Sequence, residues 1–130
     1  MPKDYQPKKN NPYYLPQPVY RQTLWMIRDY DRMVEEYDNA IWDSPEPLDG
    51  QPRGSNIGNP TEREGAKRAA LYERIHAIEQ ALLVIPESYR QAIWDNIQYY
   101  ARYPEYYSRR TYSTWRCRFL YAVAEKLYLI

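Results

Sequence analysis

Arginine and tyrosine are concentrated in the last third of the chain, from Gln98 to Ile130. Six tyrosines occur between positions 99 and 112, and five arginines occur between positions 102 and 118, where Glu105 is the only acidic residue. Guanidinium groups contact phosphates and guanine, and tyrosine rings stack on bases or donate hydrogen bonds to the nucleic-acid backbone. These residue types favour contact with a polyanion. No combination of nucleophile, base and orienting group is apparent, so we do not expect an enzyme.

A C-terminal helix over residues 108–128 is expected to position these groups. Ser108 suits its N-cap, because the hydroxyl can accept a hydrogen bond from a free amide of the first turn. Apolar side chains then recur every three to four residues and so share one face: Tyr112, Trp115, Phe119, Val123 and Leu127. The other face carries Arg109, Ser113, Arg116 and Cys117. Such a helix, entered through a tight joint, is typical of a helix-turn-helix in a DNA groove, and equally of many protein-binding helices.

The first third of the chain predicts an arm, a helix and a loop. Prolines dominate residues 1–18, which indicates an extended arm that docks only through Tyr13, Tyr14 and Leu15. Residues 19–42 predict one amphipathic helix, whose apolar positions step by three and four: Leu24, Ile27, Tyr30, Val34, Tyr37 and Ile41. Four prolines and three glycines between positions 44 and 60 predict a loop over 43–59.

Two further helices follow this loop. Asn59 as N-cap, Pro60 at the first helical position and Glu62 as in a capping box predict a helix over 60–84. Its apolar stripe comprises Leu71, Ile75, Ile78, Leu82 and Ile85. Pro86 interrupts the pattern and begins a helix over 86–100. The expected architecture is all-α: a long antiparallel helical hairpin, followed by a compact helix-turn-helix-like pair of C-terminal helices.

Composition limits the class of protein further. A chain of 130 residues with 44% hydrophobic content can bury one core, so residues 19–130 are expected to form a single domain. Eighteen basic and seventeen acidic residues argue against a protein that coats nucleic acid by charge alone. Cys117, the only cysteine, permits no internal disulfide. No apolar run suits a membrane span, and the N-terminus lacks the apolar segment of a secretory signal, so we expect a cytoplasmic protein.

No metal or cofactor is expected. His76 has neither a second histidine nor a cysteine nearby in the sequence. The glycines at 50, 54 and 58 precede a helix, but the Walker lysine and the preceding strand are both missing. Cys117 lies between Arg116 and Arg118, which would lower its pKa if the thiol were exposed. The thiol is more often an ordinary small residue on a helix.

From about residue 20 to 130, the order of features resembles the RinA and ArpU type of small phage transcription regulators. The resemblance includes the amphipathic first helix, the loop from Gly54 to Glu62 and the long second helix. It continues through an aromatic helix that ends in Tyr99-Tyr100, and a terminal helix that starts near Thr111 and finishes in the segment from Phe119 to Leu127. The joint between Tyr100 and Thr111 is shorter than in the family, and one helical turn at 104–107 would replace the family's scanning helix.

The resemblance implies a phage or prophage DNA-binding transcriptional regulator of the late-gene activator type. Its sigma-factor-like C-terminal helix-turn-helix would contact double-stranded DNA, with RNA polymerase as a host partner and a homodimer suited to two-fold operators. The resemblance assigns the DNA contacts to Arg109, Arg110, Ser113, Thr114 and Arg116, and Arg102 in the joint before the helix is a further candidate for DNA contact. Tyr103, Tyr106 and Tyr107 would add aromatic contacts.

Other interpretations account for the same residues. The tyrosines would pack at the corner between the last two helices, and the arginines would solvate an exposed face or pair with the acidic first helix. A phage or mobile-element protein that binds and inhibits a host protein complex, such as a nucleic-acid-guided defence system, is the alternative function. A structural role as a helical oligomer is a third hypothesis, based on the heptad-like apolar stripes.

Overall fold

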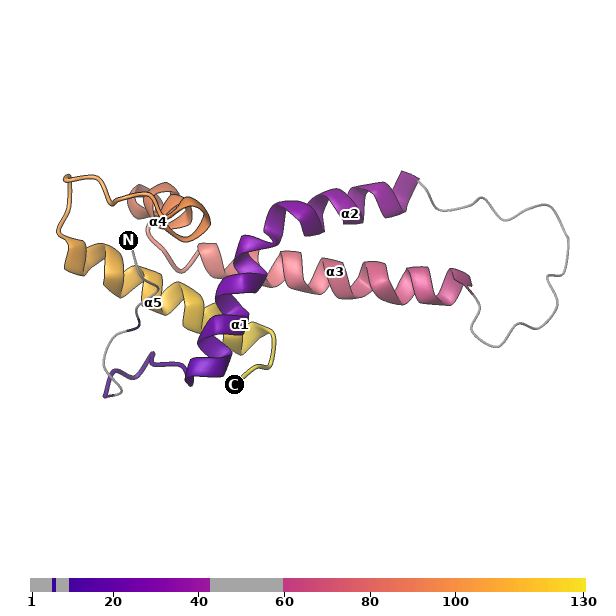
Figure 1. Cartoon of the computed structure of the whole chain (residues 1–130), viewed down its shortest axis with the longest axis horizontal. Coiled ribbons are helices and arrows are strands. Elements are labelled where there is room, and N and C mark those ends of the chain that lie inside the picture. The colour runs from indigo at the N-terminus through magenta and orange to yellow at the C-terminus, as the bar shows by residue number, and fades with distance from the viewer. Residues whose placement is uncertain (1–5, 7–9, 43–59) are drawn as a thin grey trace, which may run out of the picture.

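The computed structural model describes residue 6, residues 10–42 and residues 60–130. Figure 1 shows its helices: α1 (Gln17–Arg28), α2 (Tyr30–Trp42), α3 (Pro60–Leu82), α4 (Glu87–Tyr99) and α5 (Arg109–Lys126). The described part of the chain contains no strand, so the prediction of an all-α fold is confirmed. The loop expected over 43–59, the Asn59 cap and most of the arm before Asn10 lie outside the described residues, as does the side chain of Ile41.

The helix expected over residues 19–42 is divided into α1 and α2 at Asp29. The Asp29 amide donates to the carbonyls of Trp25 and Met26, at 3.0 and 3.2 Å, and Met33 N–H donates to the Asp29 carbonyl at 3.0 Å. The two helices lie at a marked angle (Figure 1). The bend lets α1 pack on α4 and α5 while α2 packs on α3. Tertiary packing, and not a helix-breaking residue, therefore divides this segment.

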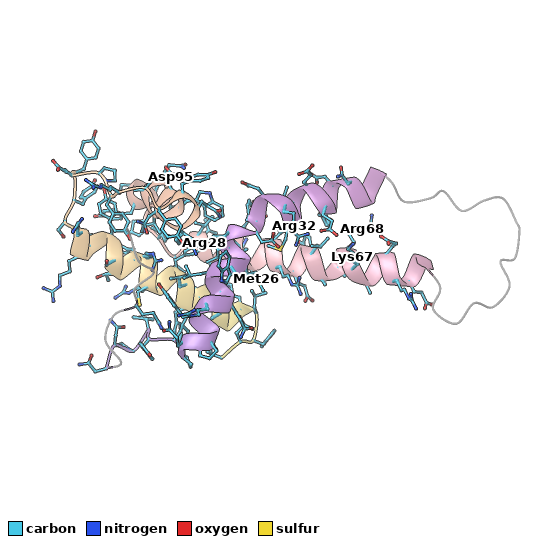
Figure 2. All side chains as sticks on the ribbon, in the orientation of Figure 1. Met26, Arg28, Arg32, Lys67, Arg68 and Asp95 are labelled. Carbon is cyan, nitrogen blue, oxygen red and sulfur yellow. The ribbon has the colours of Figure 1, made fainter. Side chains whose placement is uncertain are left out.

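Helices α2 and α3 form the antiparallel hairpin that the two apolar stripes predict (Figure 1). Met33, Leu71, Ile75 and Ile78 are buried. The hairpin is bridged on its surface by Lys67 Nζ, which lies 2.6 Å from Glu36 Oε1, and Figure 2 shows Lys67 and Arg32 at this junction. Because Lys67 is exposed and Glu36 is only partly buried, this ion pair is screened by solvent, and the buried aliphatic side chains contribute most of the stability of the hairpin.

Helix α5 packs against α1, α3 and α4, so it runs through the centre of the core. Its Tyr112, Phe119, Leu120 and Val123 are buried. The corner before α4 is closed by Arg90, whose Nε donates to the carbonyls of Leu82 and Ile85 at 3.1 and 2.7 Å. The packing of α5 against three helices fixes its direction, and with it the position of Arg109 and Arg110 at its N-terminus. In the described ranges, no helix combines the length and the apolar character that a membrane crossing requires.

Candidate nucleic-acid interface

The N-terminus of α5 carries a formed cap. Ser108 has extended backbone angles, with φ −67° and ψ 148°, and its Oγ accepts a hydrogen bond from Thr111 N–H at 3.2 Å. The Ser108 and Thr111 hydroxyls lie 2.9 Å apart and share a second hydrogen bond. The first turn contains no acidic residue. Because the N-terminus of a helix carries a partial positive charge, this end of α5 is favourable to an anion.

Four of the side chains assigned to DNA contact are exposed on the first two turns of α5: Arg109, Arg110, Ser113 and Thr114. Arg102, in the segment that precedes α5, is also exposed. Among the residues that the structure describes, no carboxylate pairs with Arg102, Arg109 or Arg110. The Thr114 hydroxyl donates to the Arg110 carbonyl at 2.8 Å, which leaves its lone pairs for an external donor. These five residues form the candidate interface.

Arg116 does not belong to that surface, so the expectation that it lies on the outward face of the helix is wrong. The residue is only 9% exposed, and its Nη1 donates to the Tyr20 hydroxyl at 2.9 Å. Cys117, expected on the same outward face, is buried as well. The buried side of α5 is wider than the apolar spacing indicated, because the helix is covered by α1, α3 and α4 together. Trp115, expected inward, is only half-buried. The Arg118 guanidinium carbon lies 4.9 Å from the centroid of the Trp115 ring.

Two of the tyrosines between α4 and α5, Tyr103 and Tyr107, pack against other rings. Tyr103 is half-buried and stacks on Tyr112, with ring centroids 4.7 Å apart and planes inclined by 8°. Tyr107 meets Tyr89 edge-on at 4.6 Å. Tyr106 differs, because it is 86% exposed. Of the three tyrosines assigned to aromatic contacts, Tyr106 alone offers most of its ring to a ligand.

The segment from Tyr100 to Ser108 is not a shortened scanning helix. Tyr100 ends α4 in the left-handed conformation, with φ 57°, and the chain then extends to a turn around Glu105 and Tyr106. The single helical turn expected at 104–107 is not formed. Asn96 holds the extended part, because its Nδ2 donates to the Ala101 carbonyl at 2.9 Å and its Oδ1 accepts from the Tyr103 hydroxyl at 3.3 Å.

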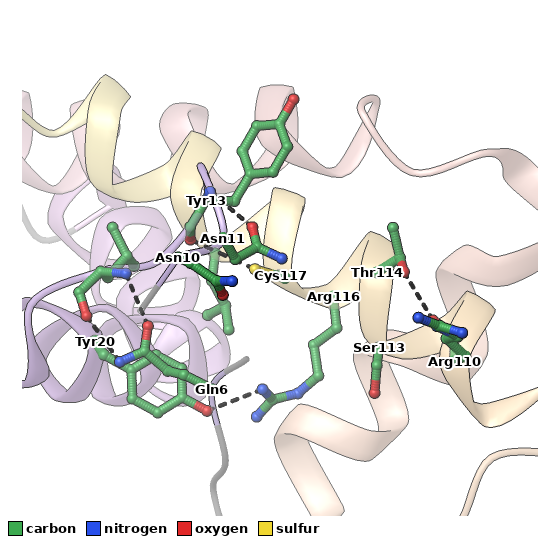
Figure 3. Close-up of a pocket in the computed structure, with 12 residues that line it drawn as sticks. Gln6, Asn10, Asn11, Tyr13, Tyr20, Arg110, Ser113, Thr114, Arg116 and Cys117 are labelled. Atoms are coloured by element: carbon green, nitrogen blue, oxygen red, sulfur yellow. Dashed lines mark hydrogen bonds between the residues drawn. The ribbon is translucent and has the colours of Figure 1, made fainter. Parts of the chain in front are cut away.

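A pocket of about 450 Å³ adjoins the candidate interface (Figure 3). Arg110, Ser113 and Thr114 line it from α5, and Asn10 and Asn11 line it from the arm. Figure 3 shows the Arg116 side chain reaching across to the Tyr20 hydroxyl. The buried Arg116 and the exposed Arg110 therefore line the same pocket.

The arm contacts α5 through Tyr13, one of the three residues that the sequence indicates, and is folded back on itself by Gln6. The Gln6 side chain accepts from the Leu15 amide and donates to the Leu15 carbonyl, both at 2.8 Å. Cys117 Sγ donates to the Tyr13 carbonyl at 3.4 Å, and Tyr13 meets Tyr121 edge-on at 5.4 Å. Gln6 carries no sequence signal for this role, because the pairing depends on how the arm folds back.

The environment of Cys117 makes it a structural residue. Burial raises the pKa of the thiol, and the neighbouring Arg116 and Arg118 offset that rise only in part. The described residues contain no group of three histidine, cysteine, aspartate or glutamate side chains that could hold a metal ion. Comparison of the chain with protein-family models, curated proteins and solved structures gave no match.

Proposed function

We propose that the protein is a phage or prophage transcriptional regulator that binds double-stranded DNA through the first two turns of α5. The observation that carries this proposal is the pair Arg109 and Arg110, exposed at a capped helix N-terminus that has no acidic neighbour in its first turn. Arginines at such a helix end are suited to phosphate contacts and guanine contacts, whereas the Thr114 hydroxyl, which donates to the Arg110 carbonyl, can only accept from a base donor. The assignment to phage regulation rests on the resemblance of the sequence to RinA and ArpU proteins.

The packing of α5 supports this use of its N-terminus. Tyr112 and Phe119 bury the helix on one side, so the exposed arginines project from a rigid element. Arg110 and Thr114 are four residues apart and therefore neighbours on the helix surface. Arg102 extends the cationic surface into the joint before the helix. With Arg116 buried, the expected duplex contact involves fewer arginines than the sequence indicates.

Duplex binding can be measured by the fluorescence anisotropy of a fluorescein-labelled 20-base-pair DNA. Changing Arg109 and Arg110 together to alanine is expected to lower the affinity about tenfold or more, because two charge-assisted phosphate contacts are lost. Arg63→Ala is the matched control, because Arg63 is an exposed arginine on α3. Equal affinities for the double variant and the unchanged protein would remove the proposed site.

Binding to a host protein complex is the second candidate function. Tyr99 and Tyr106 favour it, because both rings are mainly exposed and tyrosine is enriched at protein interfaces. If RNA polymerase is the partner, Tyr99→Ala with Tyr106→Ala should abolish co-purification with the purified polymerase, whereas Arg109→Ala with Arg110→Ala should not. Co-purification that survives the tyrosine changes would exclude this surface.

A further inference from the structure

A second cationic and aromatic surface lies at the bend between α1 and α2, away from the N-terminus of α5. Arg21, Trp25 and Arg28 are spaced by four and three residues, so they lie along one face of α1. Together with Arg74 of α3 they line a depression of about 690 Å³, whose floor includes Met26 and Met33. Figure 2 shows Met26 and Arg28 on α1. We call Arg21, Trp25, Met26, Arg28, Met33 and Arg74 together the Trp25 surface.

Trp25 is the unusual member of this surface, because a tryptophan on a packed helix is normally buried to a large extent. It is 66% exposed. The Arg28 guanidinium carbon lies 5.5 Å from the Trp25 ring centroid and 4.6 Å from the Tyr100 ring centroid. Arg28 Nε also donates to the Ile97 carbonyl at 2.8 Å, which holds the guanidinium between the two rings. The result is an ordered row of cation and aromatic ring, with the indole accessible.

The charge of the Trp25 surface is positive. Among the described residues that line the depression, Asp29 is the one carboxylate. Arg32 Nε donates to Asp29 Oδ1 at 2.6 Å, and this hydrogen bond with Arg32 holds the pKa of the carboxyl below its ordinary value. Arg21 and Arg74 are both exposed. The depression therefore presents the accessible Trp25 ring together with the cationic Arg21 and Arg74. Its one carboxylate, Asp29, is ionised and its charge is paired with Arg32.

We propose that the Trp25 surface binds single-stranded nucleic acid. An unpaired base would stack on the Trp25 indole, and the adjoining phosphates would pair with Arg21 and Arg74. Aromatic rings in a cationic groove are the usual means of binding single strands, because every base has a π-face and the backbone is anionic. This site differs from the α5 surface in both residues and ligand form, so it does not depend on duplex binding there.

The test measures the affinity of the full chain for a fluorescein-labelled dT12 oligonucleotide and for the 20-base-pair duplex. Trp25→Ala is expected to weaken dT12 binding about tenfold or more, because loss of one stacked base has an effect of this size. Trp25→Phe should retain most of the affinity. Arg21→Ala with Arg74→Ala should weaken dT12 binding as well. Tyr72→Ala is the matched control, because Tyr72 is an aromatic residue on α3, 52% exposed and outside the depression.

The variants separate this site from the duplex surface. Arg109→Ala with Arg110→Ala should leave dT12 affinity unchanged, and Trp25→Ala should leave duplex affinity unchanged. Unaltered dT12 affinity in Trp25→Ala overturns the inference. Loss of dT12 binding in Arg109→Ala with Arg110→Ala, but not in Trp25→Ala, overturns it as well. Equal competition by a deca-glutamate peptide would show a site for acidic polypeptides instead. A change of molecular mass in Trp25→Ala would assign the surface to self-association. Circular dichroism checks that each variant is folded.

Discussion

Arg116 and Tyr20 are separated by 96 positions in the sequence and meet inside the core, where Arg116 Nη1 donates to the Tyr20 hydroxyl at 2.9 Å. The guanidinium carbon also lies 5.9 Å from the centroid of the Tyr20 ring. This contact joins α5 to α1 and turns the middle of α5 inward. Arg109 and Arg110 remain outside, because they lie a turn or more before Arg116, at the end of the helix. Arg116 therefore supports the fold, and the exposed Arg102, Arg109 and Arg110 are left for a ligand.

Changing Tyr20 to phenylalanine should lower the free energy of unfolding by about 1–3 kcal/mol, because a buried charged donor loses an acceptor. Urea denaturation followed by circular dichroism measures the change. Tyr106→Phe removes a hydroxyl from an exposed ring and should have almost no effect. Duplex affinity should stay the same in both variants. Equal stability of Tyr20→Phe and the unchanged protein would mean that the Arg116 contact is not stabilising.

The helical part of the fold could be predicted because it depends on local sequence. The stripe Leu71, Ile75 and Ile78 repeats at the helical period, and all three side chains are buried in α3. The Ser108 cap was likewise predicted, because a serine before a periodic segment has a local physical reason. The bend at Asp29 has no such signal, because neither proline nor glycine occurs there. It results from α1 and α2 packing on different partners.

The candidate site was only partly predictable, for a related reason. Periodicity treats arginine as an outward residue, so it assigned Arg116 to the exposed face. Its burial depends on Tyr20, which no spacing rule connects with α5. Exposure of Arg109 and Arg110 follows more simply from their place at the end of the helix. Trp25 lies outside the apolar stripe of residues 19–42 and is 66% exposed on α1, and periodicity assigns no role to an aromatic residue there.

Cys117 should make the protein less stable at alkaline pH. Burial raises the pKa of its thiol above the ordinary 9.0, so the unfolded chain loses this proton at a lower pH than the folded chain. Above pH 9 the unfolded state then binds fewer protons, and the free energy of unfolding falls as pH rises. Below pH 9 both states keep the proton, and the thiol makes no pH-dependent contribution. Thermal melts at pH 7, 9 and 10 measure the effect.

Cys117→Ala provides the control for this alkaline effect. Burial also raises the pKa of Tyr103 above the ordinary 10.0 of the phenol, so a decline near pH 10 should remain in the variant. The earlier decline, which begins near pH 9, should be lost. Identical pH profiles in the two proteins would show that the thiol does not account for it.

Ser108 allows helix capping to be separated from charge at the candidate interface. Ser108→Ala removes the hydroxyl that accepts from Thr111 N–H, and should lower the free energy of unfolding by about 1 kcal/mol. Ser108→Asp keeps a capping oxygen and adds a negative charge next to the helix N-terminus, so stability should be retained. Duplex affinity should nevertheless fall in Ser108→Asp, because the carboxylate repels phosphate. Unchanged duplex affinity in this variant would place the DNA contact elsewhere.

The salt dependence of duplex binding should reveal which arginines contact phosphate. Each phosphate neutralised contributes about −0.9 to the slope of log affinity against log salt concentration. Arg109→Ala with Arg110→Ala should therefore reduce the steepness of the slope by about 1.8, if each side chain neutralises one phosphate. Arg116→Met should leave the slope unchanged even if it destabilises the fold, because the buried guanidinium releases no counterions. Anisotropy titrations between 50 and about 200 mM salt cover the range in which this dependence is large. A slope that falls in Arg116→Met and not in the double variant would show that the buried arginine turns outward to bind DNA.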